Sequence, residues 1–164
     1  MKLTKQAINT QEEVAELYET IKVIWPEVFT PIIGAEQVAY MLRTYQSPEN
    51  IAAEIESGAR YFLLKVQGQP VGYTAYEVRD EDIYLSKIYL SQTVRGKGYS
   101  SEVFDWYEEV AREHGKHYVR LRVNQGNTRA IEVYEHRGFI NKGVLISPIG
   151  EGFEMTDFVF EKEV

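Results

Sequence analysis

The sequence contains no cysteine, which excludes thiol nucleophiles, thiolate metal sites and disulfide bonds. It also lacks any run of the roughly 18 apolar residues that a membrane span needs. The first 30 residues carry acidic side chains where a secretory signal needs a continuous apolar segment, so we expect a cytoplasmic protein with no membrane partner. A chain of 164 residues can bury a sizeable core, and we expect a single domain over residues 1–164.

The sequence also lacks an excess of basic residues, and its net charge is −7. This balance argues against a nucleic-acid partner, since such a partner requires a positive face that displaces counterions from phosphates. The charge is uneven: residues 92–142 hold nine Lys and Arg against seven Asp and Glu, whereas the rest of the chain holds nine against eighteen. The first region suits an anion and the remainder suits a cation, unless the charges only solvate surface helices.

Hydrophobic spacing, capping residues and turn signals predict alternating helices and strands without an internal repeat. We expect Pro26 to end the first helix, so that the segment WPEVFTPIIG forms a connection. The three strands between residues 61 and 91 are expected to form an antiparallel meander. The expected order is strand 3–8, helices 10–26, 35–45 and 48–58, strands 61–66, 71–79 and 83–91, helix 100–114, strand 118–124, helix 128–137, and a hairpin of 139–146 with 153–160.

The segment VRGKGYSSEVFDWYEE places a glycine-rich loop between a strand and an amphipathic helix. Such a loop directs several backbone amides and the positive end of the helix dipole toward one point, which suits a phosphate. Gly96 and Gly98 allow close approach of the ligand, and Arg95 and Lys97 add positive charge. The alternative is a turn without a ligand.

Two common phosphate-binding motifs do not match this loop. A P-loop requires Lys followed by Ser or Thr after its second glycine, and that pair is absent. A dinucleotide-binding loop requires a third glycine, and Ser101 occupies its position.

The loop instead resembles the [Q/R]-x-x-G-x-[G/A] signature of the GNAT superfamily of acyl-CoA-dependent N-acetyltransferases, with Ser100 at the last position. The preceding IYLSKIYLSQTVRGKG is similar to the family's fourth strand, and NQGNTRAIEVYEHRGF is similar to its fifth strand end and following helix. The resemblance implies an α/β (α+β) fold: one GNAT-like domain with a mixed, mostly antiparallel sheet of six to seven strands and helices on both faces.

The resemblance implies acetyl-CoA as the acyl donor and no metal. Loop amides would hold the pyrophosphate, the main chain of the fourth strand would pair with the pantetheine arm, and Asn127 would contact that arm, unless it only caps a helix. The implied cofactor-binding residues are Ile88, Tyr89, Leu90, Arg95, Gly96, Lys97, Gly98, Tyr99, Ser100, Ser101 and Asn127.

In this family the acceptor amine attacks the thioester directly, so no nucleophilic side chain is required. Tyr134 resembles the tyrosine that many members direct at the thioester sulfur, and it is the expected general acid unless it is only core. Tyr84 stands where many relatives carry the glutamate that serves as base, and we keep it as a candidate catalytic residue. Glu77 is the candidate base acting through water, with Asp157 as an alternative.

The resemblance places the acceptor beside the first helices, where the candidate substrate-binding residues are Trp25, Phe29, Tyr40 and Tyr45. The ending IGEGFEMTDFVFEK resembles a bacterial branch of small-molecule acetyltransferases that includes polyamine-acetylating members. We therefore expect a small, cationic amine as substrate. A non-catalytic acyl-CoA sensor, a protein N-terminal or lysine acetyltransferase, and a homodimer stay open.

Overall fold

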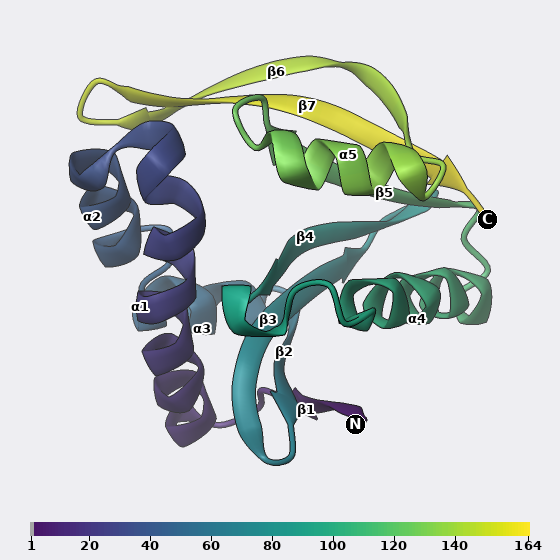
Figure 1. Cartoon of the computed structure of the whole chain (residues 1–164), viewed down its shortest axis with the longest axis horizontal. Coiled ribbons are helices and arrows are strands. Elements are labelled where there is room, and N and C mark those ends of the chain that lie inside the picture. The colour runs from purple at the N-terminus through teal and green to yellow at the C-terminus, as the bar shows by residue number, and fades with distance from the viewer. Residues whose placement is uncertain (1) are drawn as a thin grey trace. The chain divides into compact units, whose positions relative to one another are not determined.

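The computed structural model describes residues 2–164, which form seven strands, five α-helices and one 3₁₀ helix (Figure 1). The sequence-based order of elements is confirmed. The elements are β1 (Leu3–Ala7), α1 (Gln11–Ile33), α2 (Ala35–Arg43), α3 (Pro48–Glu56), β2 (Arg60–Val66), β3 (Gln69–Val78), β4 (Asp82–Leu90), η1 (Gln92–Val94), α4 (Tyr99–Glu113), β5 (Tyr118–Asn124), α5 (Thr128–His136), β6 (Ile140–Gly150) and β7 (Phe153–Glu163).

The seven strands form one sheet in the order β1-β2-β3-β4-β5-β7-β6. Strand β4 pairs with β5 in parallel, from Asp82 opposite Tyr118 to Leu85 opposite Leu121. The pairs β1–β2, β2–β3, β5–β7 and β6–β7 are antiparallel. The sheet is therefore mixed and mostly antiparallel, and the expected α/β fold class is confirmed.

The chain divides into two compact units. The first contains the residues up to Glu77 together with Lys87–Trp106, and the second contains Val78–Ser86 and Tyr107–Val164. In the first unit, helices lie on both faces of the strands. Residues of α1 and α3 contact side chains on one face of β2–β4, whereas Trp106 of α4 packs against Phe62 on the other face, with ring centroids 5.0 Å apart.

Helix α1 is longer than expected, because it continues through Pro26 and Pro31 to Ile33. A proline inside a helix removes a backbone hydrogen bond and costs about 3 kcal/mol. Trp25 and Phe29 lie one turn apart on the buried face, and their rings pack 4.3 Å apart between centroids. Burying each such side chain contributes about 1.5–3 kcal/mol, which offsets the prolines and keeps this segment helical.

The second unit is held by strand pairing and by ion pairs between neighbouring strands. Arg120 of β5 donates to Glu161 of β7 from Nε at 3.1 Å, and its Nη1 lies 3.1 Å from Asp82 Oδ2 of β4. Helix α5 adds Tyr134 to the core of this unit. Across residues 2–164, no helix combines the length and the apolar character that crossing a membrane requires.

Candidate active site

The glycine-rich loop follows β4 through a short 3₁₀ turn. Ser91 caps this turn, with its Oγ accepting from the Thr93 amide at 3.3 Å. Gly96 and Gly98 then adopt left-handed backbone angles, with φ of 77° and 82°, before α4 begins at Tyr99. A Cβ atom at either glycine would meet open space, so glycine is required there for its backbone conformation and not for lack of room.

Helix α1 reaches this loop through Glu27. The Glu27 carboxylate accepts a hydrogen bond from the Gln92 amide at 2.7 Å, which supplies an acceptor for one amide of the 3₁₀ turn. The two residues are 65 positions apart, and no sequence motif connects them. Sequence analysis therefore missed Glu27.

The second half of β4 brings predicted cofactor and substrate residues together. The ring of Tyr89 lies 5.7 Å from that of Phe29 and 5.3 Å from that of Tyr73, between centroids. Phe29 in turn packs on Trp25, and both are almost fully buried, with exposed fractions of 4% and 1%. The predicted acceptor wall and the predicted pantetheine strand are thus in contact, through the buried Phe29 and the half-buried Tyr89.

The other two predicted substrate residues are placed differently. Tyr40 is buried on α2, with the Arg43 guanidinium 5.3 Å from its ring centroid. Tyr45 lies in the connection between α2 and α3 with 41% of its surface exposed, and its carbonyl accepts from Asn50 Nδ2 at 2.7 Å.

Gly72 of β3 lies against the main chain of the same β4 segment. A Cβ atom there would fall 2.3 Å from the Tyr89 carbonyl oxygen and 3.2 Å from the Leu90 Cα. Any side chain at this position would displace the backbone of β4, since real Cβ atoms do not approach so closely. Gly72 therefore fixes the spacing of the strand that the resemblance assigns to pantetheine.

Glu77, at the end of β3, belongs to the first unit and acts electrostatically on Lys87 and Tyr61. Lys87 was not among the sequence-based candidates, although it directly precedes Ile88. It forms a half-buried ion pair with Glu54 of α3. A charged residue well inside a strand rich in apolar and aromatic residues was the available signal.

Tyr134 lies on α5 in the second unit and is 8% exposed. Its ring packs against Phe139 and Phe160, at centroid distances of 6.0 and 6.2 Å. Burial raises the pKa of the Tyr134 phenol, so the group keeps its proton to higher pH than a solvated tyrosine and is a weaker acid. Asn127 caps α5, with its Oδ1 accepting from the Ala130 amide at 3.4 Å, which is the capping role considered for it.

Two arginine side chains contact the ring of Tyr84. The Arg79 guanidinium lies 3.9 Å from the centre of its ring, and that of Arg122 lies 5.6 Å away. Asp157 of β7 is buried, which raises the pKa of its carboxyl group, while nearby Arg122 acts in the opposite direction. Within residues 2–164, no group of three or more His, Asp or Glu side chains is arranged to hold a metal ion.

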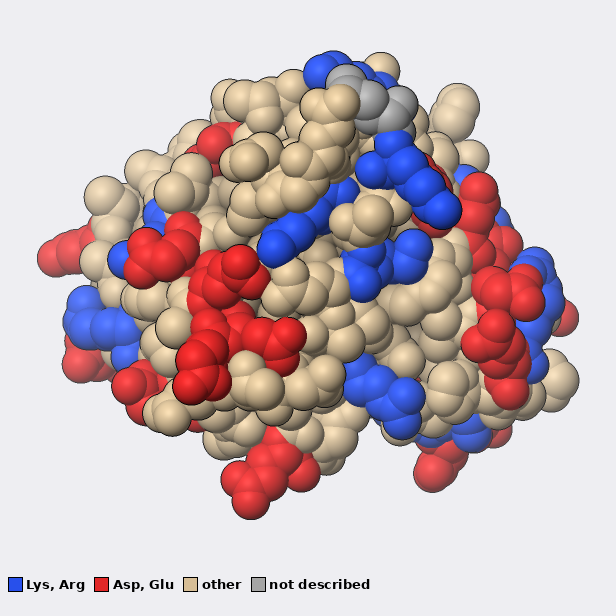
Figure 2. All heavy atoms as spheres, turned by 90° about the horizontal axis from the view of Figure 1, so that it is seen from below, with Lys and Arg blue, Asp and Glu red and all other residues tan. Residues whose placement is uncertain are grey.

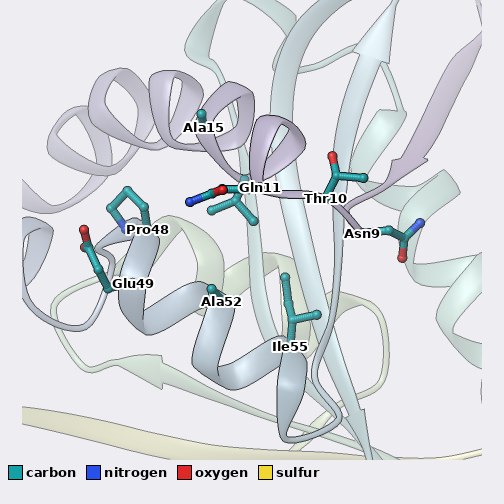
Figure 3. A pocket seen from close by; sticks show the side chains of 9 residues that line it. Asn9, Thr10, Gln11, Ala15, Pro48, Glu49, Ala52 and Ile55 are labelled. Atoms are coloured by element: carbon teal, nitrogen blue, oxygen red, sulfur yellow. The ribbon is translucent and has the colours of Figure 1, made fainter.

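A pocket of about 550 Å³ lies elsewhere in the first unit, where the start of α1 faces α3 (Figure 3). None of its lining residues belongs to the predicted site. They are Asn9, Thr10, Gln11, Val14, Ala15, Pro48, Glu49, Ala52 and Ile55.

Comparison with known proteins identifies the family of this chain. The model of the acetyltransferase (GNAT) family matches residues 14–139. An N-acetyltransferase of Lactobacillus delbrueckii subsp. lactis is 24% identical over 162 residues, covering 93% of both chains. Thialysine N-epsilon-acetyltransferase of Bos taurus is 33% identical over 86 residues, covering 46% of this chain and 51% of the bovine one. The PaiA N-acetyltransferase of Thermoplasma acidophilum, solved with coenzyme A, shares the fold over 100% of both chains, with a TM-score of 0.81 at 19% identity.

Proposed function

Because the chain belongs to the acetyltransferase (GNAT) family, we propose that it moves an acetyl group from acetyl-CoA to the primary amine of a small, cationic molecule. The observation that carries the proposal is the loop that links β4 to α4. Two left-handed glycines with open space beside them precede a helix N-terminus, with Arg95 before them and Lys97 between them. These residues suit a pyrophosphate, since the first amides of a helix and nearby cations attract phosphate oxygens.

The donor supplies an activated acyl group in the form of a thioester. The residues proposed around it have separate tasks: the amides of Gly96–Ser101 bind phosphate oxygens, and the main chain of Ile88–Leu90 aligns the pantetheine arm. The Tyr134 phenol gives its proton to the departing thiolate. A positioned acid of this kind contributes about 10²- to 10⁴-fold in rate.

The charge distribution supports a cationic acceptor. Outside residues 92–142 the chain carries eighteen acidic side chains against nine basic ones. On the face drawn in Figure 2, acidic side chains gather in clusters that Lys and Arg side chains separate. The bovine relative is named for acetylating an ε-nitrogen. An excess of carboxylates lowers the local potential and raises the concentration of cations near the protein.

The test is turnover of acetyl-CoA with polyamines, amino acids, aminoglycosides and N-terminal peptides, followed by released CoA and by product mass. We expect spermidine-like amines to be acetylated. The KM for a polycation should rise with ionic strength more than that for a neutral amine, since exposed charges are screened beyond about 8 Å at physiological salt. Acetylation of a neutral or anionic acceptor alone would remove the cationic substrate and keep the transfer reaction.

A second candidate is an acyl-CoA sensor without catalysis. It is favoured by Tyr84, which lies between Arg79 and Arg122 where many relatives carry a carboxylate. A sensor should bind acetyl-CoA tightly in calorimetry and release no CoA with any amine of the panel.

A further inference from the structure

Four polar side chains form a connected group on the α3 side of the first unit. Tyr61 Oη of β2 donates to Glu54 Oε1 of α3 at 3.0 Å, and Asn50 Nδ2 donates to Glu54 Oε2 at 2.6 Å. Lys87 Nζ of β4 lies 4.0 Å from Glu54 Oε1 and 5.7 Å from the centre of the Tyr61 ring. Two donors, Tyr61 and Asn50, thus hold the Glu54 carboxylate in one position beside the Lys87 side chain.

Within this group, the exposure of the side chains to solvent increases from Lys87 on β4 to Glu54 on α3. The side chain of Lys87 is 13% exposed, whereas that of Glu54 is 34% exposed. A proton on Lys87 Nζ therefore has a carboxylate next to it, and that carboxylate contacts solvent. Tyr61 is buried, and its burial and the neighbouring Glu54 raise the pKa of its phenol, so Tyr61 remains a donor and does not compete for the proton.

Lys87 holds its proton less tightly than a solvated lysine. Burial lowers the pKa of its ammonium, and Glu54 and Glu77 act against this effect. These two carboxylates and the Tyr61 ring face Lys87 from α3, β3 and β2. An alkylammonium has a pKa of about 10.4 and is neutral to about one part in a few thousand at pH 7. An acceptor amine therefore needs a group that takes up its proton.

The position of Lys87 suits that task under the proposed function. If the pyrophosphate is bound in the loop after β4, the pantetheine arm runs back along Leu90, Tyr89 and Ile88, and the thioester reaches the Lys87 end of the strand. Side chains alternate along a strand, so Lys87 and Tyr89 point to the same face. Tyr89 contacts Phe29 of the predicted acceptor wall on that face.

We propose that Lys87 and Glu54 form the path by which the acceptor ammonium passes its proton to solvent. The proposal rests on the proposed acetyltransferase function. In this step a neutral Lys87 amine takes a proton from the acceptor ammonium and passes it to Glu54 and water. The neutral acceptor nitrogen then forms a bond to the thioester carbon while the carbon–sulfur bond breaks and the electron pair leaves with sulfur. The nitrogen loses its second proton by the same path as it becomes an amide, and the thiolate takes up a proton from the Tyr134 phenol, which solvent protonates again.

The test compares Lys87→Arg and Glu54→Gln with the parent in kcat/KM for spermidine between pH 7 and pH 10. Arginine keeps the charge and does not release its proton, and Gln keeps the shape of Glu54. We expect both variants to be about 100-fold slower at pH 7 and within about threefold of the parent at pH 10, where solution supplies the neutral amine. Lys65→Arg is the matched control, since Lys65 pairs with Glu16 at 3.4 Å on the same unit, and it should follow the parent throughout.

The alternative is that Lys87 and Glu54 form only a structural ion pair. In that case the deficit would be the same at every pH, or absent, and the proton path would be wrong. Calorimetry with acetyl-CoA separates this outcome from failure of the proposed function: a parent that binds no acetyl-CoA and acetylates no amine would overturn both. If Lys87→Arg fails to fold in a thermal melt, the pH dependence of Glu54→Gln decides alone.

Discussion

The Glu27 carboxylate accepts a hydrogen bond from the Gln92 amide at 2.7 Å and so joins the middle of α1 to the start of the proposed cofactor loop. Glu27 lies between Trp25 and Phe29, and Phe29 contacts Tyr89. The helix of the predicted acceptor wall is therefore attached to the donor segment at two points. Changes on one side should affect binding on the other.

Glu27→Ala is expected to weaken CoA binding about tenfold, or about 1.4 kcal/mol, because a hydrogen bond to a charged group contributes about 1.5–3 kcal/mol to ordering this turn. Calorimetry with CoA measures the change. Glu19→Ala on the same helix is the control, since the Glu19 side chain is exposed and pairs with its neighbour Lys22. Equal affinities of both variants would show that the Glu27 contact does not support the loop.

Gly98→Asp is expected to weaken CoA binding by more than tenfold. The substitution forces a non-glycine residue to adopt a φ of 82° and places a carboxylate beside the proposed pyrophosphate. Gly115→Asp is the matched control, because Gly115 has a φ of 68° and open space around it, and it follows α4 instead of preceding it. If both variants bind CoA as the parent does, the cofactor site lies elsewhere.

Tyr134→Phe should lower kcat about 100-fold and leave acetyl-CoA affinity and folding stability nearly unchanged, because the ring and its packing are kept. Burial raises the pKa of Tyr134, so the parent should not lose this acid on the alkaline side until well above pH 10. Steady-state kinetics and calorimetry provide the two readings, with Tyr118→Phe as control. Undiminished turnover would assign Tyr134 to the core alone.

Glu108 should be important for the stability of the second unit. Its Oε2 accepts from Arg137 Nη2 at 2.7 Å and from Lys162 Nζ at 3.1 Å, so it joins α4 to the end of α5 and to β7. Removing one partner of a largely buried ionic group leaves the others uncompensated, and we expect Glu108→Ala to cost about 3 kcal/mol in urea unfolding. Glu109→Ala, at a side chain that is 59% exposed, should change stability by less than about 1 kcal/mol. Similar losses for both would contradict the network.

Local sequence signals were sufficient for most elements of the fold. Thr10 and Glu13 form the capping box that begins α1, and Ser47 with Pro48 begins α3 as expected. The helix end predicted at Pro26 was wrong because the local preference of proline is outweighed by the burial of Trp25 and Phe29, which depends on the assembled core. The extent of a helix is therefore less predictable than its start.

The candidate site was predictable where consecutive residues carry it. The loop from Arg95 to Ser101 is a single segment, so its glycines and cations could be recognised together. Glu54 and Lys87 are 33 positions apart and lie on a helix and a strand, and their proximity depends on how α3 packs on the sheet. Contacts of this kind arise from tertiary structure and leave no local pattern.

The close approach of Gly72 to the Tyr89 carbonyl has a consequence for protein engineering. Libraries that aim at a new acceptor will naturally diversify the residues around Tyr89, because its ring faces the aromatic wall formed with Phe29. Gly72 should be kept in such libraries, since even alanine at this position would displace the backbone of β4. Variants with a displaced strand would lose donor binding, whatever their selectivity for the acceptor. The side chains of α1 are better positions for substitution, because changes there leave the spacing of β3 and β4 intact.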